Sequence, residues 1–419
     1  MTLDLDPARE RRMLWTLAAI QFTTVLDFMV IMPLAPQFTR VFNLSTQQFG
    51  WLLSAYTFAA AVAGIAAAVV IERFERKRLL LAMYVGFVAA AIVTASAQNF
   101  EMLLIARALA GIFGGVLYGV IFTVIGDTIP EARRGHATGV VMTSFAVATV
   151  AGVPVALLLS NAFNWRAAFL VVAASGAINA WVAAKTLPNV GRTLPPDVER
   201  QHERQMWSEF VRTLVFPNHV RAFVFTWLMM ISGFSVIPYI SLYMVTNIGL
   251  PETQLPLIYL AGGVATFFTA RWFGRWADYS GKRETYRWVA LISLVPLLAI
   301  THAPALPLVA TLLLAVMFFV FVSGRMVPGM AVVTSAARPG ARAAFMTLNG
   351  SVMQIGSGCA ATLAGALIQR APSGVLQNYN WVGWIAAAAT LIAMWWVSGI
   401  KTLDAVPAAP LPEEPISQV

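Results

Sequence analysis

The chain has 419 residues, of which 59% are hydrophobic and only 11% charged, and its formal net charge is +9. A soluble globular domain carries about 25% charged residues, so this composition excludes a polar outer surface and indicates a protein that faces lipid. Long runs rich in Ala, Leu, Gly and Met exclude a β-barrel, whose strands would be about ten residues long and alternate in polarity.

Apolar segments follow one another along the whole chain, each close to the roughly 20 residues that a helix needs to cross a bilayer. The first segment is too long for a cleaved signal peptide and has no small-residue cleavage site, so we expect it to be a span. The sequence predicts an all-α membrane protein with twelve transmembrane helices, at residues 13–36, 47–71, 79–97, 101–126, 137–160, 166–187, 220–246, 254–276, 285–302, 305–334, 343–369 and 380–400.

The distribution of basic residues predicts the orientation. With the N-terminus inside, 23 of the 28 Lys and Arg residues fall on the inner side, and only Arg40, Arg166 and Arg370 on the outer side. Cytoplasmic loops carry such an excess of Lys and Arg, so we expect both termini to be cytoplasmic, in a multi-pass protein of the bacterial inner membrane. Because topology accounts for the positive charge, no nucleic-acid partner is predicted.

Two short repeats indicate a duplicated chain. Pro130-Glu-Ala-Arg133 recurs as Pro339-Gly-Ala-Arg342 after 209 residues, and the charged segment from Glu72 recurs from Asp278 after 206 residues. Two matches at nearly one separation predict duplicated six-helix halves. The expected parts are an N-terminal bundle at 1–187, a Pro-rich and charged cytoplasmic linker at 188–219, a C-terminal bundle at 220–402 and a tail at 403–419.

The loop between the eighth and ninth spans carries a recognisable motif. Its sequence runs Gly274-Arg-Trp-Ala-Asp278-Tyr-Ser-Gly281-Lys282-Arg283. This resembles the signature G-x-x-x-D-x-x-G-R/K-R/K of the major facilitator superfamily. The first-half counterpart keeps the charges of Glu72, Arg73 and Arg76 but lacks both glycines.

Charges at these helix ends suggest a cytoplasmic gate. An acid there can pair with bases of neighbouring helices and hold one conformation of a carrier. The alternative is a solvated loop that only follows the positive-inside rule.

The resemblance extends over essentially the whole chain. The fourth span has the R-x-x-x-G pattern, formed by Arg107 and Gly111. The fifth span has a fragment of the motif of antiporters, Gly152-Val-Pro154. The sixth span begins with a segment that resembles the W-R-x-x-F turn of efflux permeases, Trp165-Arg166-Ala-Ala-Phe169. The sequence is most similar to the twelve-span drug/proton antiporter and arabinose-efflux-permease-like branch. This resemblance implies two pseudo-symmetric six-helix bundles, alternating access and a monomeric protein.

Three charged residues stand out among those within the predicted spans. Such residues normally face a cavity or a partner, because a charge at a helix centre costs about 2.5–3.5 kcal/mol to insert. Asp27, near the middle of the first predicted span and one turn after Thr23 and Thr24, is the candidate proton carrier; the alternative is an Asp locked to a buried Arg or hydroxyl. Arg107 is a candidate for binding an anionic group or modulating the proton site. Arg325 is a candidate for the counter-charge of Asp27. For both residues the alternative is a structural role that holds neighbouring helices together.

Polar residues in two other spans are candidates for the substrate cavity. Thr347, Ser351 and Gln354 form a stripe at three- and four-residue steps, and Ser235 and Tyr239 lie where Gly233 and Pro238 are expected to break the seventh span. Transporters bind substrate at such broken helices near the membrane midplane. Hydrogen bonding between helices is the alternative for each residue.

These features predict a secondary active transporter that exports a small molecule or drug in exchange for protons. Proton-coupled uptake or facilitated exchange of a metabolite is a second possibility, and a transport-inactive sensor or scaffold a third. The sequence has no P-loop, no metal-ligand spacing among its four His residues and one Cys, and no nucleophile–base pattern. We therefore expect no cofactor, no metal and no enzymatic activity, and the expected partners are the substrate, protons and the lipid bilayer.

Overall fold

The computed structural model describes residues 6–70, 74–189, 207–338 and 340–403. Nearly all regular structure in these residues is helical, as predicted. The exception is a short antiparallel hairpin, β1 (Gln369–Arg370) with β2 (Leu376–Gln377), in which Gln369 lies opposite Gln377.

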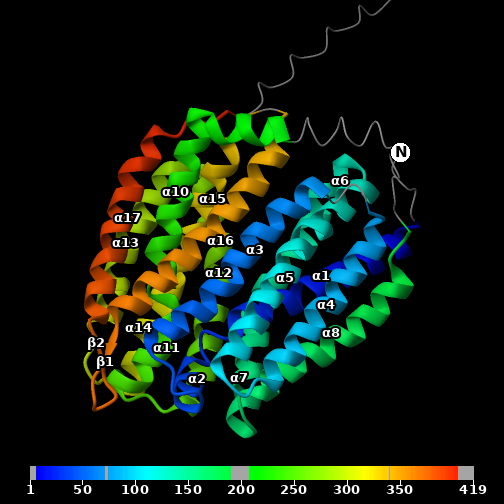
Figure 1. Cartoon of the computed structure of the whole chain (residues 1–419). Coiled ribbons are helices and arrows are strands. Elements are labelled where there is room, and N and C mark those ends of the chain that lie inside the picture. The colour runs from blue at the N-terminus through cyan, green and yellow to red at the C-terminus, as the bar shows by residue number, and fades with distance from the viewer. Residues whose placement is uncertain (1–5, 71–73, 190–206, 339, 404–419) are drawn as a thin grey trace, which may run out of the picture.

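The described part of the first half is made of long and shorter helices (Figure 1). They are α1 (Pro7–Val30), α2 (Ala35–Val41), α3 (Thr46–Val70), α4 (Arg76–Ser96), α5 (Phe100–Thr128), α6 (Glu131–Val147), the π-helical turn η2 (Ala148–Gly152), α7 (Val153–Ala162) and α8 (Arg166–Thr186).

The second half begins after a helix at residues 207–215, which lies inside the predicted linker. Its elements are α10 (Pro217–Phe234), η3 (Ile237–Tyr239), α11 (Ile240–Tyr243), the π-helical turn η4 (Met244–Ile248), η5 (Glu252–Gln254), α12 (Leu255–Ser280), α13 (Lys282–Thr301), α14 (Leu308–Phe318), the π-helical turn η6 (Phe319–Ser323), α15 (Met326–Ser335), α16 (Arg342–Leu367), α17 (Tyr379–Trp396) and η7 (Val397–Gly399).

Eleven helical segments in the described residues are long and apolar enough to cross a membrane. The eleventh span predicted from the sequence, at 343–369, corresponds to α16, which has 26 residues but is not among these eleven. Its Thr, Ser, Asn and Gln residues lower its mean hydropathy, so length alone supports it as a span.

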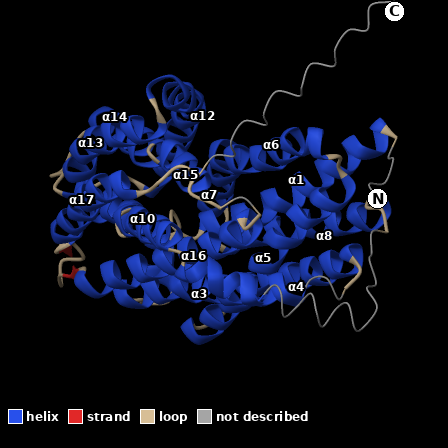
Figure 2. Cartoon of the chain, turned by 90° about the horizontal axis from the view of Figure 1, so that it is seen from above, coloured by secondary structure: helices blue, strands red, loops and turns tan. Residues whose placement is uncertain are grey.

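The two halves meet along α3 and α16, which run side by side between them (Figure 1). Seen from above, α1, α4, α5 and α8 lie on one side of this pair and α12, α13, α14 and α17 on the other (Figure 2). Helix α3 also packs on α5, and α16 on α10. The halves also meet where α12 packs on η2 and α7, so two separate helix contacts join the bundles.

Both ends of the described chain lie at one end of the bundle. Thr16 near the start of α1 bonds to Thr186 at the end of α8, and the amide of Asn218 bonds to the backbone of Lys401. The chain leaves α8 toward residue 189 and returns at residue 207, so we call this the linker end. The opposite end, which carries α2, η5 and the β-hairpin, is the hairpin end (Figure 1).

Proline and glycine interrupt two spans, of which only the break in the seventh was expected from the sequence. Helix α1 ends at Val30, shortly before Pro33, and the seventh span bends between Phe234 and the short 3-10 helix η3 that contains Pro238. Three spans also contain a π-helical turn, at η2, η4 and η6. The predicted break in the seventh span is thus present.

Glycines bring α3 and α5 into backbone contact. A Cβ on Gly111 would collide with the backbone oxygen of Tyr56, and one on Gly115 with that of Ala60. Because the colliding atoms are backbone, no side-chain rotation can relieve them. Small residues at such interfaces let transmembrane helices approach closely.

We expect Gly111→Ala to lower the unfolding temperature of the detergent-solubilised protein by several degrees, because overpacking costs about 1–3 kcal/mol. Gly119→Ala, on the same helix, is the matched control, since nothing lies within 4 Å of its Cβ position. Equal unfolding temperatures for Gly111→Ala and the wild type would show that α3 can move away from α5 without loss of stability.

Candidate functional site

A buried ion pair joins α1 and α5 in the first half. Arg107 Nη1 donates to Asp27 Oδ2 at 2.7 Å, and the two side chains are 1% and 0% exposed. Asp27 Oδ1 and Arg107 Nε have no hydrogen-bond partner in the described part of the chain. An unpaired buried charge costs several kcal/mol, so the pair stabilises both charges, while one carboxylate oxygen stays available for a proton.

Tyr56 on α3 completes the surroundings of this pair. The guanidinium carbon of Arg107 lies 4.7 Å from the centroid of the Tyr56 ring, a cation–π arrangement. Gly111, one turn after Arg107, provides the close backbone approach that brings Tyr56 into this position. The Asp27–Arg107 pair thus lies where three helices of the first half meet.

The structure corrects the expected position of Asp27. Helix α1 begins at Pro7 and ends at Val30, so Asp27 lies three residues before its end, nearer the hairpin end than the centre of the predicted span 13–36. The hydroxyls of Thr23 and Thr24 do not bond to it. Thr23 bonds to the Tyr84 hydroxyl at 2.7 Å, and Thr24 donates to the backbone oxygen of Gln21.

Arg325 occupies a separate site in the second half. Its Nη1 donates to Ser293 and Thr390 hydroxyls at 3.2 and 2.9 Å, and its Nη2 donates to the Ser232 hydroxyl at 2.7 Å. The expectation that Arg325 is the counter-charge of Asp27 is wrong, because Arg107 fills that role and Arg325 contacts only hydroxyls. These hydroxyls come from α10, α13 and α17, so Arg325 joins helices within one bundle.

The polar stripe of α16 faces the other half of the molecule. Ser351 donates to the backbone oxygen of Ala61 at 3.3 Å, and Thr362 bonds to the Ser54 hydroxyl at 2.5 Å. Thr347 and Gln354 on this stripe are half-buried. The stripe therefore forms part of the seam between α3 and α16.

Tyr239 and Ser235 have different surroundings, although they are one turn apart. The Tyr239 hydroxyl donates to the backbone oxygens of Thr46 on α3 and Ala361 on α16, at 3.2 and 2.9 Å, so it ties the two halves together. Ser235 is 1% exposed, and its hydroxyl has no partner among the described residues.

The charged loops lie at the linker end. Arg76 Nε pairs with Asp127 Oδ2 at 2.9 Å, and Arg283 donates to the backbone oxygen of Ile400. Glu72 and Arg73 lie outside the described residues. Asp278 is exposed and makes no ion pair within the described ranges, and Lys282 is half-exposed.

Gly281 of the loop motif and its first-half counterpart Glu75 differ in backbone conformation. Gly281 has φ 90°, which favours glycine, whereas Glu75, 206 residues earlier, begins α4 with an ordinary φ of −61°. Gly274 has only Val327 near its Cβ position, at 4.0 Å. The conformation of Gly281 therefore favours glycine, whereas that of Glu75 suits any residue.

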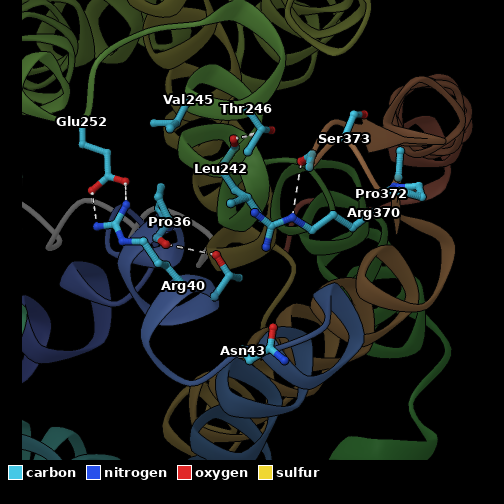
Figure 3. A pocket seen from close by; sticks show the side chains of 13 residues that line it. Pro36, Arg40, Asn43, Leu242, Val245, Thr246, Glu252, Arg370, Pro372 and Ser373 are labelled. Carbon is cyan, nitrogen blue, oxygen red and sulfur yellow. Dashed lines mark hydrogen bonds and ion pairs between the residues drawn. The ribbon is translucent and has the colours of Figure 1, made fainter.

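An ion pair connects the halves at the hairpin end. Arg40 contacts both carboxylate oxygens of Glu252, at 2.5 and 3.2 Å, and Asn161 donates to the Glu252 backbone oxygen at 3.3 Å. The hydrogen bond to Glu252 raises the pKa of Arg40 above its usual range. A pocket of about 560 Å³ opens beside this pair, with Arg370 of the hairpin on its wall (Figure 3).

Several of these contacts were not predicted from the sequence. The structure alone identifies the contacts made by Tyr56, by Asp127, by the Arg40–Glu252 pair, and by Ser293 and Thr390 around Arg325. For Asp127 the sequence did contain a signal, because an acidic residue directly follows the predicted span 101–126. Among the described residues, no group of three or more His, Cys, Asp or Glu residues could hold a metal ion.

Comparisons with known proteins agree with this architecture. The family model described as the Major Facilitator Superfamily matches residues 17–323 and 222–417. Among solved structures, a bacterial homolog of the human lysosomal transporter Spinster, in its inward-facing unoccupied conformation, matches with a TM-score of 0.68 and 17% identity, covering 94% of this chain and 95% of the other. The inward-facing occupied form of the same homolog matches with a TM-score of 0.68 and 16% identity, covering 94% of this chain and 95% of the other. A point mutant of the nucleoside transporter NupG matches with a TM-score of 0.75 and 10% identity, covering 93% of this chain and 99% of the other.

We expect Asp27→Asn to lower the free energy of unfolding by about 3–5 kcal/mol, because it leaves Arg107 buried without a counter-charge. Arg107→Gln should lower the free energy of unfolding by a similar amount, because it leaves Asp27 buried without a counter-charge. In the double variant the loss of stability should be clearly smaller than the sum of the two single losses. Denaturation of the purified protein in detergent measures all three. Strictly additive losses would contradict a coupled pair.

Proposed function

The chain belongs to the Major Facilitator Superfamily of transporters, and on that premise we propose that it exports a small molecule in exchange for protons by alternating access. The observation that carries this proposal is the buried Asp27, which Arg107 contacts through one oxygen only. Carboxyl groups within membranes characteristically serve as proton relays.

The proposed topology has twelve spans and cytoplasmic termini in a bacterial inner membrane. The twelfth span is α16, whose 26 residues suffice to cross a bilayer. The linker end is cytoplasmic in this proposal because the basic residues at the starts of α1, α4, α6 and α13 gather there. The hairpin end, where Arg40 and Arg370 lie, faces outward.

The proposed state is inward-facing. Support comes from where the bonds between the halves lie. The Arg40–Glu252 pair, the Tyr239 hydroxyl and the bonds of Thr46 to the end of α16 are all toward the hairpin end. At the linker end, the ion pairs Glu10–Arg133 and Arg76–Asp127 each stay within one half. A similar fold has been captured inward-facing in the Spinster homolog.

Protonation of Asp27 is the proposed coupling step. A neutral carboxyl no longer attracts Arg107 as an ion, so α1 is less firmly bound to α5. The contact of Arg107 with the Tyr56 ring does not involve Asp27. Protonation therefore changes the relative free energies of the two conformations, which a coupled carrier requires.

The cytoplasmic gate of this proposal forms in the outward-facing state. Asp278, Lys282 and Arg283 at the α12–α13 turn, with Gly274 and Gly281 shaping it, would then meet the loop that contains Glu72, Arg73 and Arg76. The exposed Asp278 is free to do so. Substrate contacts are proposed for Arg107, Arg325, Thr347, Ser351, Gln354, Ser235 and Tyr239.

We expect the protein, reconstituted in liposomes with a trapped pH dye, to move protons when a transported compound is added from a panel of lipophilic cations, sugars, amino acids and organic anions. Asp27→Asn should abolish this proton flux but keep substrate exchange down a gradient, since Asn mimics the protonated carboxyl. Glu101→Gln, which removes an exposed acid on α5, is the control and should behave as the wild type.

The results of this assay distinguish export from coupled uptake, facilitated exchange and a transport-inactive sensor or scaffold. Proton flux that accompanies inward movement of the compound would indicate coupled uptake, and exchange without proton flux in the wild type would indicate a facilitator. If no compound moves at all, a sensor or scaffold becomes the better explanation. Proton flux unchanged in Asp27→Asn would remove Asp27 from the coupling step.

We expect the Arg40–Glu252 pair to favour closure of the hairpin end. The only cysteine, Cys359, can be replaced by Ala, and Ser54→Cys then reports on opening of the α3–α16 seam. Glu252→Lys should speed labelling of that thiol by an impermeant reagent by about two- to five-fold, because an exposed ion pair contributes up to about 1 kcal/mol. The swap Arg40→Glu with Glu252→Arg should restore the slow rate; failure of the swap with normal folding would mean that this pair does not influence closure.

A further inference from the structure

The helix at residues 207–215 lies across the linker end of the second half, just before α10, and is the green helix at the top of Figure 1. We call it the linker helix. One side of it packs on the second half, because Phe210 and Thr213 are only 2% and 0% exposed. Glu209 Oε1 also accepts a hydrogen bond from Arg338 Nη2 at 3.5 Å. These contacts attach the linker helix to the bundle in one orientation.

A second side of the linker helix is apolar and exposed. Four large apolar side chains there are between 46% and 69% exposed: Trp207, Val211, Leu214 and Val215. Successive residues of an α-helix are rotated by about 100°, so these four fall within one arc of about 100°. We call this side the apolar arc.

The sides of the linker helix follow one another in a fixed order around its axis. The apolar arc lies between the buried side with Phe210 and Thr213 and a polar side with Ser208 and Arg212, both exposed. A surface helix in water would instead be polar over its whole exposed surface. Protein on one side, apolar surface on the next and polar groups on the third suit a helix at the boundary of a bilayer.

The linker helix also lies at the level of the membrane interface. Tryptophan is enriched at this level, and exposed tryptophans lie toward the linker end of three spans: Trp181 of α8, Trp288 of α13 and Trp395 of α17. Trp396 Nε1 donates to the backbone oxygen of Arg221 at 3.0 Å, so α10 crosses the level of the α17 tryptophans at Arg221. Pro217, where α10 begins, is four residues earlier, or about 6 Å farther along the axis. That distance is comparable with the thickness of the headgroup layer.

We propose that the apolar arc of the linker helix inserts into the boundary between headgroups and acyl chains, and so anchors the second half to the surface of the bilayer. A lipid surface fits both the apolar arc and its neighbouring polar side, because Arg212 is placed to meet lipid phosphates while Trp207 lies among the acyl ends of the headgroups. The inference depends on neither the transported compound nor proton coupling.

The test measures what surrounds single spin labels on the full-length protein in nanodiscs of phosphatidylethanolamine and phosphatidylglycerol. Cys359 is replaced by Ala, and a nitroxide is attached to Val211→Cys, Leu214→Cys or Arg212→Cys. Collisions with oxygen, which concentrates among acyl chains, are compared with collisions with a water-soluble nickel complex. Arg212→Cys is the matched control, because Arg212 is exposed on the polar side of the same helix.

We expect the ratio of oxygen to nickel collisions at positions 211 and 214 to be at least about two-fold higher than at 212, because an interfacial helix buries its apolar face about 5–10 Å into the boundary. Adding Trp207→Ser and Leu214→Ser to the Val211→Cys protein should lower its ratio at least about two-fold, since two of the four anchoring side chains are then polar. Phe210 and Thr213 are unchanged in this variant, so the attachment of the helix to the bundle is kept.

Three results would overturn the proposal. Equal ratios at all three positions would mean that the apolar arc has no preferred contact with lipid. A lower ratio at 211 and 214 than at 212 would place the arc in water. Labels at 211 and 214 that neither oxygen nor nickel reaches would show that protein, and not lipid, covers this side of the helix.

Discussion

The requirement that a buried charge have a partner governs the interior of this protein. Asp27 and Arg107 satisfy it together, and Tyr56 can contact Arg107 only because Gly111 lets the backbones of α3 and α5 touch. The glycine, the aromatic ring and the ion pair are therefore one unit. If any of them is displaced, the others lose the contacts that stabilise charge in a medium of low dielectric constant.

The α3–α16 seam, one of the contacts between the halves, relies on a different interaction. Hydroxyl groups and backbone oxygens cross the seam between α3 and α16, and Ser54 and Tyr239 each bond to both helices. Such bonds contribute about 0.6 kcal/mol on average within membranes. Several weak bonds can be exchanged one after another, so a seam of this kind suits two bundles that must move relative to each other.

Sequence reasoning succeeded where the signal is local. Apolar runs predicted the helices, because hydropathy along about 20 residues decides whether a segment can cross lipid, and Gly233 with Pro238 predicted the break after α10. It failed where the answer depends on distant residues. The sequence pairs Arg325 with Asp27 because both are charges in hydrocarbon, and nothing local identifies Arg107 as the nearer partner. The stripe on α16 was ambiguous, since small polar residues suit a cavity and a seam equally well.

The π-helical turns in three spans, η2, η4 and η6, give the molecule an internal means of rotation. A π-helical turn holds one residue more than an α-helical turn. If it converts to α geometry, the rest of the helix advances by one residue, which is about 1.5 Å along the axis and about 100° around it. The backbone exchanges one hydrogen bond for another in this step, so a span can turn its side chains toward a new neighbour without exposing an unpaired amide to lipid.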